Sequence, residues 1–269
     1  MKKRAFRVGI FDSGIGGLTV LNACIARVPY ARYFYYGDNL RAPYGNRSED
    51  EILSFTKEAC DYFLKIGVDA VVIACNTATA CALGELRRSY PFPVIGMEPA
   101  IKPAAERCKK VLVLATEKTV ESARLKVLLS RFPDCDFTVH ACLSLAGAIE
   151  KFYTKGERFL LSSHLPDGQF DGVVLGCSHY SYFARQILAR YHAPVFDGNK
   201  GVAKRLEQVL FKVAAGRIDH PLSTQNPNNC FSFNGKKGVK FVGKSRKRNK
   251  NVYLRTFVLD KPEKKVKKF

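Results

Sequence analysis

The sequence predicts an α/β fold made of two pseudo-symmetric α/β domains, with mainly parallel sheets, covering helices and an active site in the inter-domain cleft. Short apolar runs alternate with amphipathic stretches through most of the chain. This alternation is typical of parallel strands that are joined by helices. Three successive apolar runs recur in the second half at an offset of about 103 residues. The recurrence indicates that one topology occurs twice, about a pseudo-twofold axis.

The predicted strands are short runs of apolar or aromatic residues. Runs of this length suit strands that are buried within a sheet. In chain order they span residues 8–11, 33–36, 70–74, 94–96, 111–114, 137–140, 173–175 and 195–196. One more strand is expected over residues 251–259, after a loop rich in Pro, Asn and Ser.

The predicted helices are the amphipathic stretches between these runs. They span residues 18–28, 49–66, 77–89, 120–130, 143–152, 181–191 and 202–214. The second of them begins with Ser48-Glu49-Asp50-Glu51. This is a capping-box pattern, in which the Ser and Glu side chains satisfy free N–H groups at the start of the helix.

The order of the elements divides the chain into two domains. The first is expected to contain residues 1–97 and 209–269, and the second residues 98–208. Ligands favour the carboxyl ends of parallel strands and the clefts between domains. The active site is therefore expected between the two domains.

Composition excludes several classes of protein. The chain has 269 residues and is 46% hydrophobic, which is a globular composition. It has no apolar run that approaches a membrane span of about 20 residues and no signal-peptide pattern, so a cytoplasmic protein is expected. Its nine cysteines include no Cys-x-x-Cys pair, which argues against a zinc, redox or iron–sulfur motif, and no metal is expected.

The positive charge of the chain is concentrated at its C-terminal end. The formal net charge is +20, and residues 235–269 contribute +12 of it, from 14 Lys/Arg and 2 Asp/Glu. Such a basic tail attracts nucleic acid or other anionic partners in some proteins. In others it is only a solvated end of the chain, and the sequence leaves both readings open.

A glycine-rich segment, Asp12-Ser13-Gly14-Ile15-Gly16-Gly17, follows the first predicted strand. A dinucleotide-binding fingerprint needs a third glycine at the sixth position, where this chain has Thr19. A tight turn at a helix N-terminus, able to hold a carboxylate, fits better. Asp12 is then either a buried acid that acts as a base or orients an amine, or a helix N-cap.

Two cysteines occupy matching positions, 102 residues apart, in Cys75-Asn76-Thr77 and Cys177-Ser178-His179. Each follows an apolar run and precedes a predicted helix, where the helix dipole favours a thiolate. One Cys/His pair alone would suggest a covalent nucleophile, and an isolated Cys75 would suggest a core residue. The pair of cysteines favours proton transfer on both faces of one carbon, with His179 assisting.

Five segments carry a resemblance to a known family. They are 9–17, 36–38 through Pro43-Tyr44-Gly45, 74–78, 98–103 and 175–180. Pro43-Tyr44-Gly45 alone would also fit a plain turn. Together, over roughly residues 7–215, they resemble the glutamate racemases of the cofactor-independent aspartate/glutamate racemase superfamily.

This resemblance implies interconversion of L- and D-glutamate without a cofactor, supplying D-glutamate for peptidoglycan. It implies that Cys75 acts on the D-isomer and Cys177 on the L-isomer. It adds Asp12, His179 and Glu150 as catalytic residues. The substrate contacts that it implies are Asp12, Ser13, Tyr44, Gly45, Asn76, Thr77, Thr116, Thr119, Ser178 and His179.

Two alternatives to this function remain. The first is another racemase of the superfamily, such as an aspartate racemase. The second is a nucleic-acid-binding protein that acts through its basic tail. A homodimer without membrane association is also expected.

Overall fold

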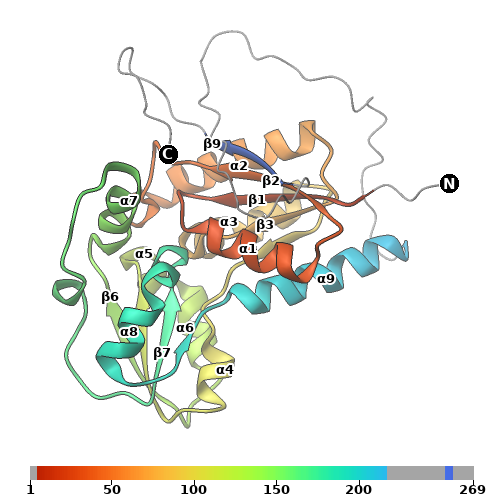
Figure 1. Cartoon of the computed structure of the whole chain (residues 1–269). Helices are drawn as coiled ribbons and strands as arrows, with labels where there is room; N and C mark the ends of the chain where they lie inside the picture. The colour runs from red at the N-terminus through yellow and green to blue at the C-terminus, as the bar shows by residue number, and fades with distance from the viewer. Residues whose placement is uncertain (1–4, 217–251, 257–269) are drawn as a thin grey trace.

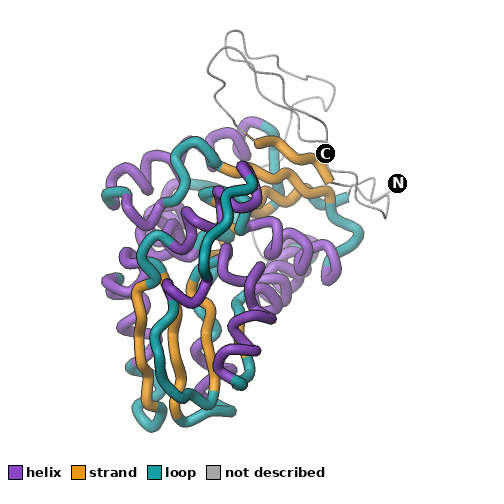
Figure 2. Tube along the Cα trace, turned by 60° about the vertical axis from the view of Figure 1, so that its left-hand side comes forward, coloured by secondary structure: helices purple, strands orange, loops and turns teal. Residues whose placement is uncertain are grey.

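The structure, a computed structural model, describes residues 5–216 and the strand 252–256. It has two lobes, each built on a parallel sheet (Figures 1 and 2). The first-lobe sheet has the order β4-β3-β1-β2-β9, and the second-lobe sheet has the order β6-β5-β7-β8. Read from the other edge, the second order is β8-β7-β5-β6, which repeats the arrangement β4-β3-β1-β2. The predicted α/β fold with two halves of one topology is therefore confirmed.

The strands lie close to their predicted positions. Those of the first lobe are β1 (Arg7–Asp12), β2 (Arg32–Gly37), β3 (Ala70–Ile73), β4 (Val94–Gly96) and β9 (Val252–Thr256). Those of the second lobe are β5 (Lys110–Ala115), β6 (Asp136–Ala141), β7 (Gly172–Gly176) and β8 (Val195–Phe196). The strand expected over 251–259 is β9, which pairs with β2. The rest of the basic tail, 235–251 and 257–269, lies outside the described residues.

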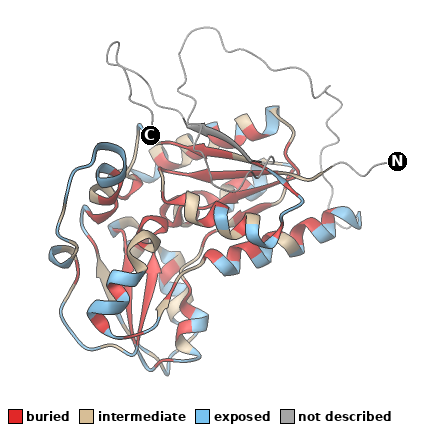
Figure 3. Cartoon of the chain, in the orientation of Figure 1, coloured by how far each residue is buried: buried red, intermediate tan, exposed pale blue. Residues whose placement is uncertain are grey.

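Helices cover both faces of the first sheet. On one face α1 (Gly17–Arg27) and α9 (Asn199–Ala214) pack over Val8 and Ile10. On the other face α2 (Glu49–Lys65) and α3 (Asn76–Ser89) pack over Phe11. Successive strand residues point to opposite faces, so one apolar strand serves both layers. Figure 3 shows β1, β3, β5 and β7 largely buried beneath helices that are exposed on their outer sides, whereas no residue of β6 is buried.

The second lobe has shorter helices. They are α4 (Ile101–Ala105), α5 (Glu117–Glu121), α6 (Ala123–Leu129), α7 (Leu145–Lys155) and α8 (Ala184–Tyr191). The 3₁₀ turns within the described part of the chain are η1 (Tyr44–Asn46), η2 (Leu161–His164) and η3 (Ser178–Phe183). The prediction of a single helix over 120–130 is wrong. Ser122 has an extended backbone (ψ 135°) and caps α6 by accepting a hydrogen bond from the Leu125 N–H. The helix predicted over 181–191 likewise begins as the 3₁₀ turn η3.

Two local features of the fold bear on the prediction. The capping box is present, because Ser48 and Glu51 exchange backbone–side-chain hydrogen bonds at the start of α2. The chain was expected to pass from the second domain back to the first at residue 209, and this position falls inside α9. Val202, Ala203 and Leu206 at the start of this helix already pack in the first-lobe core, and α9 lies beside α1 (Figure 1). The return therefore occurs before Asn199.

The described residues contain no helix long and apolar enough to cross a membrane. They also contain no group of three or more His, Cys, Asp or Glu side chains placed to hold a metal ion.

Candidate active site

The two cysteines occupy equivalent places at the carboxyl ends of corresponding strands. Cys75 follows β3 and is the N-cap of α3, where its Sγ accepts a hydrogen bond from the Ala78 N–H at 3.4 Å. Cys177 follows β7 and precedes η3. Each thiol packs at the margin of its own lobe's core and is almost inaccessible, with 5% of Cys75 and 7% of Cys177 exposed.

The electrostatic surroundings of the two thiols differ. Burial, followed by the nearby Asp12 charge, raises the pKa of Cys75 to about 12. Cys177 is a further cause of this shift in the pKa of Cys75, which places the two thiols within electrostatic range of each other. Cys177 instead has His179 as its neighbour, with its Sγ 3.8 Å from the imidazole Nδ1.

Asp12 joins the two lobes. It ends β1, is fully buried, and accepts hydrogen bonds at Oδ1 from the Gly14 N–H (2.9 Å) and at Oδ2 from the Ser178 hydroxyl (2.9 Å). Burial raises the pKa of Asp12, although His179 and these hydrogen bonds oppose the rise. A carboxylate held this way is oriented by both lobes at once.

His179 and Glu150 form a buried ion pair. The imidazole Nε2 donates to Oε2 of Glu150 at 2.7 Å. Burial disfavours the charged imidazole, but Cys177 and Glu150 outweigh burial and raise the pKa of His179 well above 6.5. Burial likewise disfavours the Glu150 carboxylate, but the hydrogen bond and charge of His179 lower the pKa of Glu150. The pair is therefore imidazolium and carboxylate near neutral pH.

The glycine-rich turn fits between these groups because it lacks side chains. A Cβ on Gly16 would lie 2.6 Å from Nδ1 of His179 and 2.7 Å from its backbone nitrogen, and one on Gly14 would collide with the Glu150 carboxylate. Two of the three glycines thus allow the first lobe to approach the second closely.

Three threonine hydroxyls form a second contact between the lobes. Thr77, at the start of α3, lies 2.9 Å from the Thr116 hydroxyl and 3.4 Å from that of Thr119. Thr116 and Thr119 lie 3.0 Å apart. Gly45 adjoins them, since a Cβ there would lie 3.3 Å from the Thr116 Cβ. All four predicted substrate contacts are therefore brought together.

The remaining predicted site residues divide into two groups. Ser13 hydrogen-bonds Cys75, and Asn76 is 4% exposed with an Nδ2 that has no hydrogen-bond partner among the described residues. Tyr44 is different, because its hydroxyl donates to the buried Asp38 at 2.6 Å and its ring packs against Phe11. A substrate can therefore reach the backbone of the Tyr44–Gly45 turn but not the Tyr44 side chain.

Sequence reasoning missed three polar side chains that contact the site. Asn39 donates from the loop after β2 to Glu150 Oε1, Tyr35 donates to the Gly14 carbonyl (2.5 Å), and Tyr182 donates to the Ile15 carbonyl (2.9 Å). Asn39 follows Asp38 in a segment that the sequence singled out, which was a usable signal. Tyr35 lies on β2 and meets the glycine-rich turn within the first lobe. Tyr182 lies in η3 of the second lobe, and only the approach of the lobes gives it its partner Ile15.

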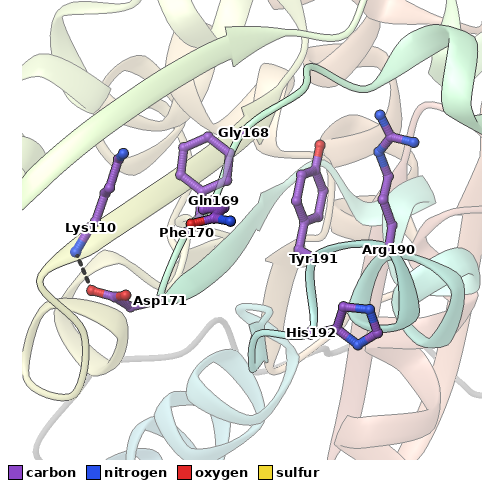
Figure 4. A pocket seen from close by; sticks show the side chains of 8 residues that line it. All are labelled: Lys110, Gly168, Gln169, Phe170, Asp171, Arg190, Tyr191 and His192. Carbon is purple, nitrogen blue, oxygen red and sulfur yellow. Dashed lines mark hydrogen bonds between the residues drawn. The ribbon is translucent and has the colours of Figure 1, made fainter.

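The space between the lobes is narrow in this structure. A cavity of about 20 Å³, room for about one water molecule, is lined by Pro43 and Gly45 of the first lobe and by Thr116, Cys142 and Ala146 of the second. A separate surface hollow lies at the amino ends of β5 and β7, around Lys110 and Arg190 (Figure 4), and shares no residue with the predicted site. This cavity is too small to hold an amino acid.

Comparisons with known proteins identify the family of the chain. A family model described as Asp/Glu/Hydantoin racemase matches residues 18–206. The glutamate racemase of Halothermothrix orenii is 39% identical over 221 residues, covering 77% of this chain and 85% of that protein. The glutamate racemase of Campylobacter concisus is 42% identical over 213 residues, covering 74% and 81%.

Two solved structures have the same fold. Escherichia coli glutamate racemase, crystallised with L-glutamate and the activator UDP-MurNAc-ala, has a TM-score of 0.71 at 29% identity, covering 77% of this chain and 83% of that one. Glutamate racemase from Aquifex pyrophilus has a TM-score of 0.61 at 32% identity, covering 81% and 97%. The resemblance noted in the sequence is thereby confirmed, and the chain belongs to the Asp/Glu/Hydantoin racemase family.

Proposed function

We propose that this protein is a glutamate racemase that interconverts L- and D-glutamate by proton transfer at Cα, without a cofactor. One observation carries the proposal: two buried thiols, Cys75 and Cys177, end corresponding strands of two similar lobes and lie within electrostatic range of each other. The names of the relatives supply the substrate. We further propose that the enzyme is cytoplasmic and supplies D-glutamate for peptidoglycan.

The reaction needs one base and one acid on opposite faces of the substrate. One cysteine thiolate removes the Cα proton and becomes a thiol, while the electron pair stays on the substrate as a carbanion. The opposing cysteine thiol then donates its proton to the other face of Cα and becomes a thiolate. In the direction from L- to D-glutamate, Cys177 is the base and Cys75 the acid, and the roles reverse for D-glutamate.

The carbanion must be stabilised by hydrogen bonds and charge in a site that excludes water. The imidazolium of His179, held by Glu150, places a positive charge beside Cys177. Asp12 is buried near Cys75, accepts a hydrogen bond from Ser178, the residue after Cys177, and orients the amine. Together these groups support proton removal and return at Cα.

Binding of the substrate is assigned to the polar groups around the thiols. Asn76, whose buried Nδ2 has no partner among the described residues, is suited to donate to an oxygen of the substrate. Ser13 and Ser178 complete the contacts near the thiols. Thr77, Thr116 and Thr119, with the backbone of the Tyr44–Gly45 turn, hold the side-chain carboxylate.

The test is racemisation in deuterium oxide. Pure protein is incubated with L-glutamate, circular dichroism follows the loss of optical activity, and mass spectrometry follows label at Cα. A two-base reaction labels the D-glutamate product early and leaves the remaining L-glutamate unlabelled. Label that appears equally in substrate and product refutes the two-base proposal. Faster turnover of L-aspartate than of L-glutamate identifies an aspartate racemase instead.

We also propose a homodimer and, through the charge of residues 235–269, weak binding of an anionic partner such as nucleic acid. Sedimentation measures the first. For the second, deleting 235–269 would also remove β9 from the first sheet. The better variant replaces the Lys and Arg residues of 236–250 with Gln, and steeply salt-dependent DNA binding that survives this change argues against the tail.

A further inference from the structure

The Glu150 carboxylate receives its hydrogen bonds from both lobes. Oε2 accepts from His179 Nε2 (2.7 Å) in its own lobe and from the Ile15 N–H (3.1 Å) in the first lobe. Oε1 accepts from Asn39 Nδ2, also in the first lobe. Two of its three donors are therefore present only while the lobes are in contact.

Both backbone polar groups of Ile15 are held by side chains of the second lobe. Its N–H donates to Glu150, and its carbonyl accepts from the Tyr182 hydroxyl at 2.9 Å. The Tyr182 ring in turn packs on Tyr153, with ring centroids 4.7 Å apart. Tyr153 lies on α7, one helical turn beyond Glu150. Tyr182 thus ties the glycine-rich turn to the helix that carries Glu150.

On this basis, and assuming the proposed function, we propose that Asn39 and Tyr182 are positioning residues of the racemase. They hold Glu150 against His179 only when the lobes are closed, that is, in contact with each other. The ion pair that keeps His179 charged beside Cys177 is therefore complete only in the closed enzyme. Neither residue touches the reacting atoms. Their effect is therefore on the rate of proton transfer and not on the reaction itself.

The chemistry of Asn39 suits this role. A carboxylate only accepts hydrogen bonds, so the amide must present its nitrogen to Glu150. Because the amide is neutral, it fixes one oxygen without competing with His179 for the negative charge. The other titratable groups that interact with Glu150 are Asp12, Tyr35 and Tyr182. None of these supplies a positive charge in place of His179.

The main test is Asn39→Asp. At pH 8 two facing carboxylates displace Glu150, and we expect kcat to fall at least about tenfold with KM within about threefold. The defect shrinks as the pH is lowered, because one proton shared by the pair restores a donor. Asn39→Leu gives the opposite trend. It loses the donor, so the pKa of Glu150 rises and the defect grows toward acidic pH.

Matched controls separate charge and ring effects from position. Asn22→Asp makes the same charge change on the exposed side of α1, and we expect wild-type kinetics. Tyr182→Phe keeps the ring and removes the hydroxyl, and we expect kcat to fall about three- to tenfold. Tyr153→Phe, on the adjacent half-exposed ring, is expected to have no effect.

Two results overturn the proposal. One is wild-type kcat and pH profile in both Asn39→Asp and Tyr182→Phe. The other is parallel, pH-independent loss of activity in the two Asn39 variants, which would indicate a merely structural residue. If wild-type protein does not racemise glutamate, the proposed function fails separately. The ¹⁵N resonances of His179 then still report on the contact between Glu150 and Asn39, since Asn39→Asp shifts the pKa of His179 and Asn22→Asp does not.

Discussion

The ion pair of His179 and Glu150 leads to the prediction that the structure defines best. Its atoms lie 2.7 Å apart, and 2% of His179 and 8% of Glu150 are exposed. Removing one partner of a buried pair costs about 3–5 kcal/mol of folding free energy. Because Glu150 keeps its donors Asn39 and Ile15, we expect about 2–4 kcal/mol for His179→Gln.

The coupling between the two residues is measured by a double-mutant cycle. The free energy of unfolding in urea is determined for wild type, His179→Gln, Glu150→Gln and the double variant. A charged, buried hydrogen bond predicts a coupling of about 1.5–3 kcal/mol at pH 6. The cycle cancels the effect that each substitution has on the rest of the site.

The pH dependence of this coupling has a defined sign. The pKa of His179 is raised above 6.5 in the folded protein, so its contribution is complete below pH 6.5 and is lost as the pH rises through the folded pKa. The pKa of Glu150 is lowered below 4.5, so its contribution is complete above pH 4.5 and is lost as the pH falls through the folded pKa. The coupling is therefore largest between these values.

Measurements at pH 6 and pH 9 test this reasoning. We expect a coupling at pH 9 that is no larger than at pH 6, because raising the pH can only remove the charge of His179. A coupling below about 0.5 kcal/mol at pH 6, within the error expected for independent sites, would refute the ion pair. A larger coupling at pH 9 than at pH 6 would refute the assignment of charges.

Three further predictions concern the thiols, the glycine-rich turn and the capping box. Cys75→Ala and Cys177→Ala each abolish racemisation in both directions with unchanged circular dichroism of the fold, and normal turnover by either variant contradicts the two-base reaction. Gly16→Ala forces apart the first lobe and His179, since its Cβ would lie 2.6 Å from Nδ1. We expect the free energy of unfolding, measured by thermal denaturation, to fall by about 1–3 kcal/mol, together with a fall in kcat. Unchanged values would mean that the lobes do not pack so closely. Ser48→Ala removes the capping box of α2 and lowers stability by about 1 kcal/mol with unaltered kcat, so a loss of activity there would contradict its purely structural role.

The sequence alone determined the positions of the strands and the repeated topology. Strand and helix patterns depend on neighbouring residues, so residues 94–96 and 195–196 were predicted with the observed bounds. The same local patterns placed Cys75 and Cys177 at strand ends. Where a local interaction was not considered, as with the extended backbone of Ser122, the prediction was wrong.

Only the tertiary structure decided which groups meet across the lobes. Glu150 on α7 reaches Asn39 and the Ile15 N–H, while Thr77 reaches Thr116. These partners lie 111, 135 and 39 residues apart in the chain, and their contacts depend on how two packed lobes are oriented. Periodicity and spacing carry no information about that orientation, because it is set by side-chain packing at the junction of the lobes.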